Sequence, residues 1–327
     1  MSNPLLDFSG LPRFAEIKDE HITPAIDVLL KENRVVVDKV RGDDHLPTWQ
    51  TFVQPMVDAS ERLSRAWGQV SHLNAVMNSP QLREIYNQNL PLITQFYAEL
   101  SQDLLLFEKF KQLRGSGVFD QLTPARKKII ENELRDFRLG GAELPSDKKQ
   151  RFLQIQEELS SLSSKFNDNL LDATNAFSLF IEDAETVAGI PADVLQTARE
   201  LAAADSKTGW KFTLHMPSYL PVLQYADNRD FREKMYRAYA TRASEFDDQA
   251  EPDKDNMPLI NKILALRQEA AQMLGYENYA EVSLATKMAT SPQQVLDFLR
   301  KLAAKAKPYA EQDLQALRQF AAEKLGL

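Results

Sequence analysis

The longest regular pattern of apolar positions in the chain runs from Phe152 to Phe177. Apolar residues recur there every three or four positions, the spacing that places side chains on one face of an α-helix. The full set is Phe152, Ile155, Leu159, Leu162, Phe166, Leu170, Ala173 and Phe177. A helix that keeps one apolar face for about seven turns usually packs antiparallel to another long helix.

Shorter patterns of the same kind predict helices along most of the chain. In four places a Ser or Thr precedes a proline, and this pair is typical of a helix start because the hydroxyl caps a free amide and proline has none to lose. These pairs are Thr23-Pro24, Ser79-Pro80, Thr123-Pro124 and Ser291-Pro292. The predicted helices are 24–41, 48–77, 80–113, 124–139, 146–176, 192–204, 219–226, 228–245, 257–274, 277–284 and 292–325.

Two short segments do not follow the helical period. Residues 178–181 (SLFI) and 210–216 (WKFTLHM) are rich in aromatic and apolar residues with partial alternation, which indicates strands. A two-stranded ribbon is marginally stable by itself, so it must lean on helices. The fold class expected is therefore mainly α, with long antiparallel helices and one small β-ribbon.

The clearest break in the sequence is Gly140-Gly141, followed by Pro145. It predicts an N-terminal helical bundle over 1–145 and a second helical region with the ribbon over 146–327. Residues 247–256 (DDQAEPDKDN) form a polar, acidic loop by composition. The apolar stripe of the last helix continues to the end of the sequence, and no later element is present to cover it.

Two of the predicted helices carry an arginine on an otherwise apolar stripe. The first stripe is Phe231, Met235, Ala238 and Arg242, and the second is Ile260, Ile263, Arg267, Ala270 and Leu274. The second helix is predicted to stop at Gly275, because glycine suits the left-handed position after a helix end.

Each of these arginines has two possible roles. It forms a structural ion pair with a buried carboxylate, or it lines a cavity where it would meet the carboxylate of a ligand. The tyrosines around them either pack in the core or line a channel. They are Tyr219, Tyr225, Tyr236, Tyr239, Tyr276 and Tyr279.

Composition narrows the classes of function. The chain has 39 basic and 47 acidic residues, a net charge of −8, and no basic block, so nucleic-acid binding is not expected. It has no cysteine, which excludes disulfides and thiolate sites. It shows no signal peptide and no apolar run long enough for a membrane span. A cytoplasmic protein without membrane contact is therefore expected.

A complete catalytic constellation is missing from the sequence. The four histidines, His21, His45, His72 and His215, lie far apart, and no pair has the four-residue spacing of the zinc motif H-E-x-x-H. Phosphate-binding glycine loops and the G-x-S-x-G nucleophile motif are also absent. The residues therefore predict no catalytic and no metal-binding position, and they leave the substrate-binding residues unknown.

Several long segments resemble one family. The chain contains NPLL at its start, VSHLNAVMNSPQLREIYNQNLPLI, LRDFRLGGAELPSDKKQRF, RAYATRAS, and ILALRQEAAQMLGYENYAEVSLATKMATSPQQVLDFL. In this order they resemble the thimet-oligopeptidase family of zinc metallopeptidases. The resemblance runs from about residue 3 to the last residue, so it is much more specific than a short motif.

The resemblance implies a mostly helical, two-lobed cytoplasmic peptidase with a deep channel for short peptides. In that family zinc is held by the two histidines of H-E-x-x-H and a later glutamate, all in the C-terminal half, and the glutamate of the motif acts as the general base. No position of this sequence matches them. We therefore expect an N-terminal portion that needs a C-terminal catalytic lobe as its partner, and that alone hydrolyses no peptide and binds no zinc. The alternative is a non-catalytic helical peptide-binding or scaffold protein.

Overall fold

The computed structural model describes residues 3–246 and 254–326. Within this part the chain forms thirteen α-helices and one two-stranded antiparallel sheet, so the mainly α fold class is confirmed. The predicted acidic loop falls largely on residues 247–253, which lie outside the described residues. None of the helices in the described part combines the length and the apolar character that a membrane crossing requires.

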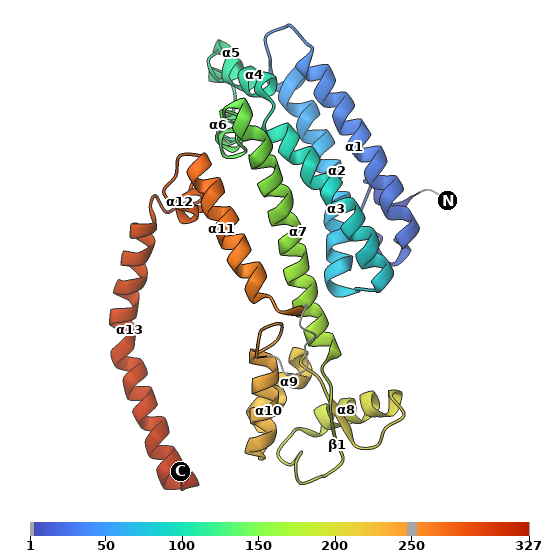
Figure 1. Cartoon of the computed structure of the whole chain (residues 1–327), viewed down its shortest axis with the longest axis vertical. Coiled ribbons are helices and arrows are strands. Elements are labelled where there is room, and N and C mark those ends of the chain that lie inside the picture. The colour runs from blue at the N-terminus through green and yellow to red at the C-terminus, as the bar shows by residue number, and fades with distance from the viewer. Residues whose placement is uncertain (1–2, 247–253, 327) are drawn as a thin grey trace.

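Three antiparallel helices form one side of the molecule: α1 (Asp19–Arg41), α2 (Gln54–Val76) and α3 (Pro80–Ser101) (Figure 1). Short 3₁₀ turns precede α1 at Pro4–Leu6 and Phe14–Glu16, and a π-helical turn, Trp49–Val53, leads into α2. The core between the three helices consists of aliphatic residues and one phenylalanine. Its members include Leu5, Ile22, Ile26, Leu29, Leu63, Val70, Ile93 and Phe96.

A second core lies at one end of these helices, under α4 (Leu104–Arg114), α5 (Gly117–Asp120) and α6 (Pro124–Leu139). It is aromatic. Phe52 meets Phe110 edge to face with ring centroids 4.7 Å apart, and Phe137 lies 5.6 Å from both Phe107 and Phe110. Such pairs add to the stabilisation that apolar burial provides.

The longest helix, α7 (Ser146–Ala176), runs through the middle of the molecule (Figure 1). It is antiparallel to α3, since Thr94 bonds Ser160 and Arg83 bonds Asp172. It is also antiparallel to α11 (Met257–Met273), since Arg151 bonds Glu269 and Asn169 bonds Asn256. The antiparallel packing expected from its apolar stripe is confirmed.

A smaller unit follows α7. Strand β1 (Leu179–Ile181) pairs antiparallel with β2 (Trp210–Phe212), with Phe180 opposite Lys211. Helices α8 (Ala192–Ala204), α9 (Met216–Tyr225) and α10 (Arg229–Ala240) pack around this ribbon. The ribbon is confirmed near 178–181 and at Trp210–Phe212.

The second strand is shorter than the 210–216 predicted. The backbone N–H of Thr213 donates to Ser218 Oγ at 3.0 Å, so the chain turns there and His215 precedes the first residue of α9. Apolar character alone does not reveal this turn.

The last helices are α12 (Tyr279–Leu284) and α13 (Pro292–Phe320), which ends in a wider turn, Ala321–Leu325. Helix α13 stands apart from α11 and α7 (Figure 1). Every residue from Leu296 to Phe320 is exposed, although the helix has one strongly apolar face. Pro308 lies inside it.

Several helix boundaries differ from the prediction, among them the start of α9 at Met216 and of α2 at Gln54. Helix α1 begins at Asp19, five residues before Pro24, because the ring of His21 accepts a hydrogen bond from the Lys18 backbone at 3.1 Å. Thr23 instead accepts a bond from Asn89 at 2.8 Å. The segment 80–113 is two helices, since Asp103 caps the amides of Leu105 and Leu106 and starts α4. The caps at Ser79, Thr123 and Ser291 are confirmed.

The turn between α6 and α7 packs closely against the end of α3. A Cβ at Gly140 would lie 2.4 Å from Ser101 Cβ, and Gly141 has φ of +87°. Glycine is therefore required at both positions, one for close approach and one for the left-handed backbone. The division into 1–145 and 146–327 at this turn stays a prediction.

Candidate functional site

The four histidines lie on separate elements. His45 Nδ1 lies 2.6 Å from Asp43 in an exposed loop, the ring of His72 packs 5.4 Å from that of Phe14, and His215 is exposed before α9. His21 caps α1. No group of three His, Asp or Glu residues in 3–246 and 254–326 could hold a metal ion, so the residues described here do not fit a zinc site.

The first arginine stripe ends differently from the prediction. Helix α10 stops at Ala240, not near residue 245, so Arg242 follows the helix. At this end Thr241 Oγ1 donates to Arg237 O at 2.9 Å, beside the Thr241 backbone N–H at 3.0 Å, and Ser244 Oγ donates to Thr241 O at 2.7 Å. Such side-chain bonds compete with a further helical turn.

Arg242 lies half-buried where α7, α9 and α10 meet. Its guanidinium stacks 3.7 Å from the centroid of the Tyr239 ring, and that ring stacks on Tyr219 with centroids 4.2 Å apart. Nε donates to Tyr239 O at 2.9 Å, and Nη1 donates to Thr174 Oγ1 at 2.8 Å. We call Tyr219, Tyr239, Arg242 and Thr174 the arginine stack.

Burial raises the pKa of Tyr219 above its usual value, and the neighbouring Tyr239 and Tyr236 act in the same direction. Arg242 opposes this shift because a cation favours the ionised phenol. Tyr219 is therefore a neutral packing residue at physiological pH. Tyr236 is different, since 60% of it is exposed.

Arg267, on the second stripe, lies half-buried with its guanidinium 4.7 Å from the centroid of the Tyr279 ring. Helix α11 ends as expected: Gly275 has φ of +84°, and the Tyr276 N–H donates to Ala271 O at 2.9 Å. Among the described residues, neither Arg242 nor Arg267 has a carboxylate within 4.0 Å. The structural ion pair is thus not found in this part of the chain.

A cluster of charges that sequence reasoning missed joins α3 to α7. Arg83 donates to both oxygens of Asp172, at 2.6 and 2.9 Å, and its Nε lies 3.6 Å from Asp168. Lys254 Nζ also donates to Asp172 at 2.7 Å. The Arg83 hydrogen bonds lower the pKa of Asp172, whereas burial raises the pKa of Asp168. Asp168 and Asp172 lie four residues apart and so share one face of α7. This spacing was the sign in the sequence that could have revealed the cluster.

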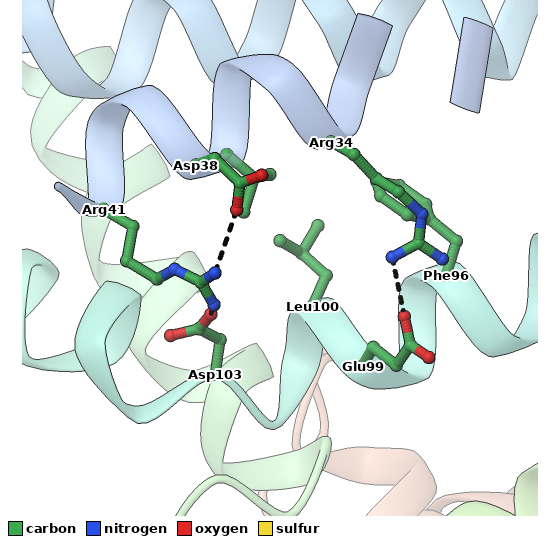
Figure 2. Close-up of a pocket in the computed structure, with 8 residues that line it drawn as sticks. Arg34, Asp38, Arg41, Phe96, Glu99, Leu100 and Asp103 are labelled. Carbon is green, nitrogen blue, oxygen red and sulfur yellow. Dashed lines mark hydrogen bonds and ion pairs between the residues drawn. The ribbon is translucent and has the colours of Figure 1, made fainter. Parts of the chain in front are cut away.

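Two grooves lie along the same contact. One, of about 620 Å³, is lined by α2, α3 and α7, and the other, of about 670 Å³, by α3 and α7. Both include Leu90, Ser160, Ser164 and Asp168. A further pocket of about 300 Å³ lies between α1 and the α3–α4 junction (Figure 2). Its arginines are already paired, Arg34 with Glu99 and Arg41 with Asp38 and Asp103.

Comparisons with known proteins give a consistent result. Residues 27–149 match the model of the neurolysin/thimet oligopeptidase N-terminal domain, and residues 222–327 match that of peptidase family M3. Oligopeptidase A of Haemophilus influenzae is 46% identical over the whole chain, and that of Escherichia coli 44%. A probable cytosolic oligopeptidase A of Arabidopsis thaliana is 38% identical over 98% of the chain.

The chain spans about half the length of these relatives: 48% of the two bacterial proteins and 46% of the plant protein. The resemblance seen in the sequence is confirmed, and it covers the whole chain.

Proposed function

Because this chain belongs to the M3 family of peptidases, we propose that it forms the N-terminal lobe and substrate-channel wall of a zinc-dependent oligopeptidase that hydrolyses short peptides in the cytoplasm. The observation that carries this proposal is the alignment of all 327 residues with proteins named oligopeptidase A, each about twice as long.

The exposed face of α13 supports the need for more polypeptide. Leu302, Tyr309 and Leu317 are each more than half exposed on a helix of 29 residues. An apolar face of this length in water is unfavourable and usually marks a contact surface. In the proposal the remainder of the peptidase covers it.

Zinc enters the proposal through the family alone. When bound in such peptidases, zinc lowers the pKa of a water molecule and polarises the peptide carbonyl. The described residues offer no ligand set, so in this proposal the remainder of the protein binds zinc. The part seen here would bind and orient peptide, with residues 1–145 as a supporting bundle and 146–327 beside the channel.

The test compares two purified proteins: the 327-residue chain, and the product of the complete reading frame with any sequence that follows. A quenched fluorescent peptide reports hydrolysis. We expect cleavage by the complete protein, its loss with a zinc chelator, and no cleavage by the 327-residue chain. Chelator-sensitive cleavage by the 327-residue chain would contradict the proposal that the remainder of the protein binds zinc.

The same experiment separates the enzyme from the scaffold alternative. If the complete reading frame encodes no H-E-x-x-H segment and its product cleaves nothing, a non-catalytic peptide-binding or scaffold role replaces the proposal.

A further inference from the structure

The guanidinium of Arg242 is fixed in place but holds a charge that no described carboxylate neutralises. We infer that Arg242 is a receptor for a carboxylate group, supplied either by a bound peptide or by polypeptide outside the 327 residues. This inference rests on the proposed function, because a peptide substrate and further polypeptide are both features of the complete peptidase.

The Arg242 receptor is already formed in this structure. The Tyr239 ring covers one face of the guanidinium. The Tyr239 carbonyl accepts a hydrogen bond from Nε, and the Thr174 hydroxyl accepts one from Nη1. These groups come from α7 and the end of α10, and Tyr219 from α9 backs the ring. The side-chain entropy that binding an anion usually costs has therefore already been lost.

The guanidinium of Arg242 has N–H donors to spare. A guanidinium has five N–H groups, and two of them have partners here. Among the described residues the two on Nη2 have none. Two other half-buried arginines each bind a carboxylate with two hydrogen bonds: Arg83 binds Asp172, and Arg151 binds Glu269 with both bonds at 2.7 Å. Arg242 has the same donors, and among the described residues no carboxylate accepts a hydrogen bond from its Nη2.

The chemistry of the guanidinium points to the ligand. A planar guanidinium that presents a free Nη2 edge prefers a carboxylate, since charge-assisted bonds of this kind are short and strong. A peptide carries a carboxylate at its C-terminus, and an Asp or Glu from the remaining polypeptide carries one as well. The acidic residues Asp247, Asp248, Glu251 and Asp253 lie outside the described residues, and the experiment includes them.

The experiment uses Arg242→Gln, with Arg237→Gln as the matched control, because Arg237 lies on α10 and its side chain is 69% exposed. In the complete protein, kcat/KM is measured for two peptides that differ only in a C-terminal carboxylate or carboxamide. A loss of about tenfold or more for the carboxylate peptide alone supports a peptide ligand. Thr174→Val, which only loosens the guanidinium, should give a smaller loss of the same kind.

The second arm measures thermal midpoints of the complete protein and of the 327-residue chain. If the remaining polypeptide supplies the carboxylate, Arg242→Gln lowers the midpoint of the complete protein, not that of the shorter chain, and lowers cleavage of both peptides equally.

Three results overturn the inference. Arg242→Gln could behave as Arg237→Gln in every assay, or it could destabilise both lengths equally, which shows a purely structural role. Neutralising Asp247, Asp248, Glu251 and Asp253 together could reproduce its effects, which places the carboxylate within this chain. If the wild-type complete protein cleaves nothing, the proposed function fails, while calorimetry with acetyl-Phe-Ala and its carboxamide and the thermal arm still test the receptor.

Discussion

Helix α7 makes two long contacts, both with polar bonds, that differ in whether they also bury an apolar cluster. Towards α11 it presents Phe152 and Ile155, which bury with Leu266 and Ala270. Towards α3 it presents Ser160, Ser164 and Asp168, joined by hydroxyl, amide and charged bonds and flanked by the two grooves. Apolar burial dominates folding free energies, whereas net gains from exposed polar bonds are small. The α7–α11 contact should therefore be the more stable of the two.

The largest effect is expected from Phe152→Ala. The side chain is 2% exposed at the α7–α11 contact, so truncation removes buried area and leaves a cavity, at a cost of about 3–5 kcal/mol. Urea unfolding measures the change. Phe298→Ala on exposed α13 is the control and should change the free energy of unfolding by less than about 0.5 kcal/mol. Equal effects would show that α7 and α11 are not tightly packed.

Next in size is Asn169→Ala. Asn169 Nδ2 donates to Asn256 Oδ1 at 2.9 Å, and both residues are buried. Its loss leaves the amide oxygen of Asn256 unpaired, which costs about 1–3 kcal/mol. Asn175→Ala, at an exposed position of the same helix, is the control. In a double-mutant cycle with Asn256→Ala the two costs should not add, and additivity would disprove the bond.

On the α3 side, Asp172→Asn should cost about 1 kcal/mol at pH 7 because the pair with Arg83 is partly exposed. The pKa of Asp172 is lowered in the fold, so its contribution is full above the unfolded pKa of about 3.9 and is lost as the pH falls through the folded value. Urea unfolding at a series of pH values should show less acid sensitivity in the variant. An unchanged slope would contradict the prediction.

Asp168→Asn should act in the opposite sense. Burial raises the pKa of Asp168, so in the native protein its protonation favours the folded state as the pH falls through that value towards the unfolded pKa. The variant lacks this gain, and its stability should fall more steeply in acid. A flatter profile than that of the wild type would be the contrary result.

The smallest effect is expected in the pocket of Figure 2. Glu99 pairs with Arg34 at 2.9 Å, but both side chains are well exposed. Glu99→Gln should change the free energy of unfolding by less than about 0.5 kcal/mol, with little dependence on salt. A larger, salt-sensitive loss of unfolding free energy would contradict this prediction and show that the Glu99–Arg34 pair stabilises the fold as much as the Arg83–Asp172 pair does.

The sequence predicts the α11 side of α7 well and the α3 side poorly. Apolar residues at helical spacing report burial directly, so the stripe containing Phe152 and Ile155 leads to the antiparallel packing found. Ser160, Ser164 and Asp168 carry no such pattern, because polar side chains on a helix usually face solvent and their spacing does not mark a contact with another helix. Their contacts depend on Arg83 and Thr94, which are distant in sequence, and only the fold brings them together.

The arginine stack shows the same limit on a smaller scale. The spacing of Phe231, Met235, Ala238 and Arg242 predicts one continuous helix face, yet α10 ends at Ala240. Ala243 has a left-handed backbone with φ of 50°, which a further helical turn would not allow, and apolar spacing does not reveal it. The sequence therefore identifies Arg242 as unusual but not the tyrosine ring and hydroxyl that orient it.

Helix α13 has a mechanical consequence. Its 29 residues extend about 43 Å, and it adjoins α12 at one end while its residues from Leu296 onward are exposed. For a rigid helix of this length, a tilt of about 5° near Pro292 would correspond to a displacement of about 4 Å at the far end. The packing where α11 and α12 meet, next to Arg267 and Tyr279, therefore sets where the apolar face of α13 lies.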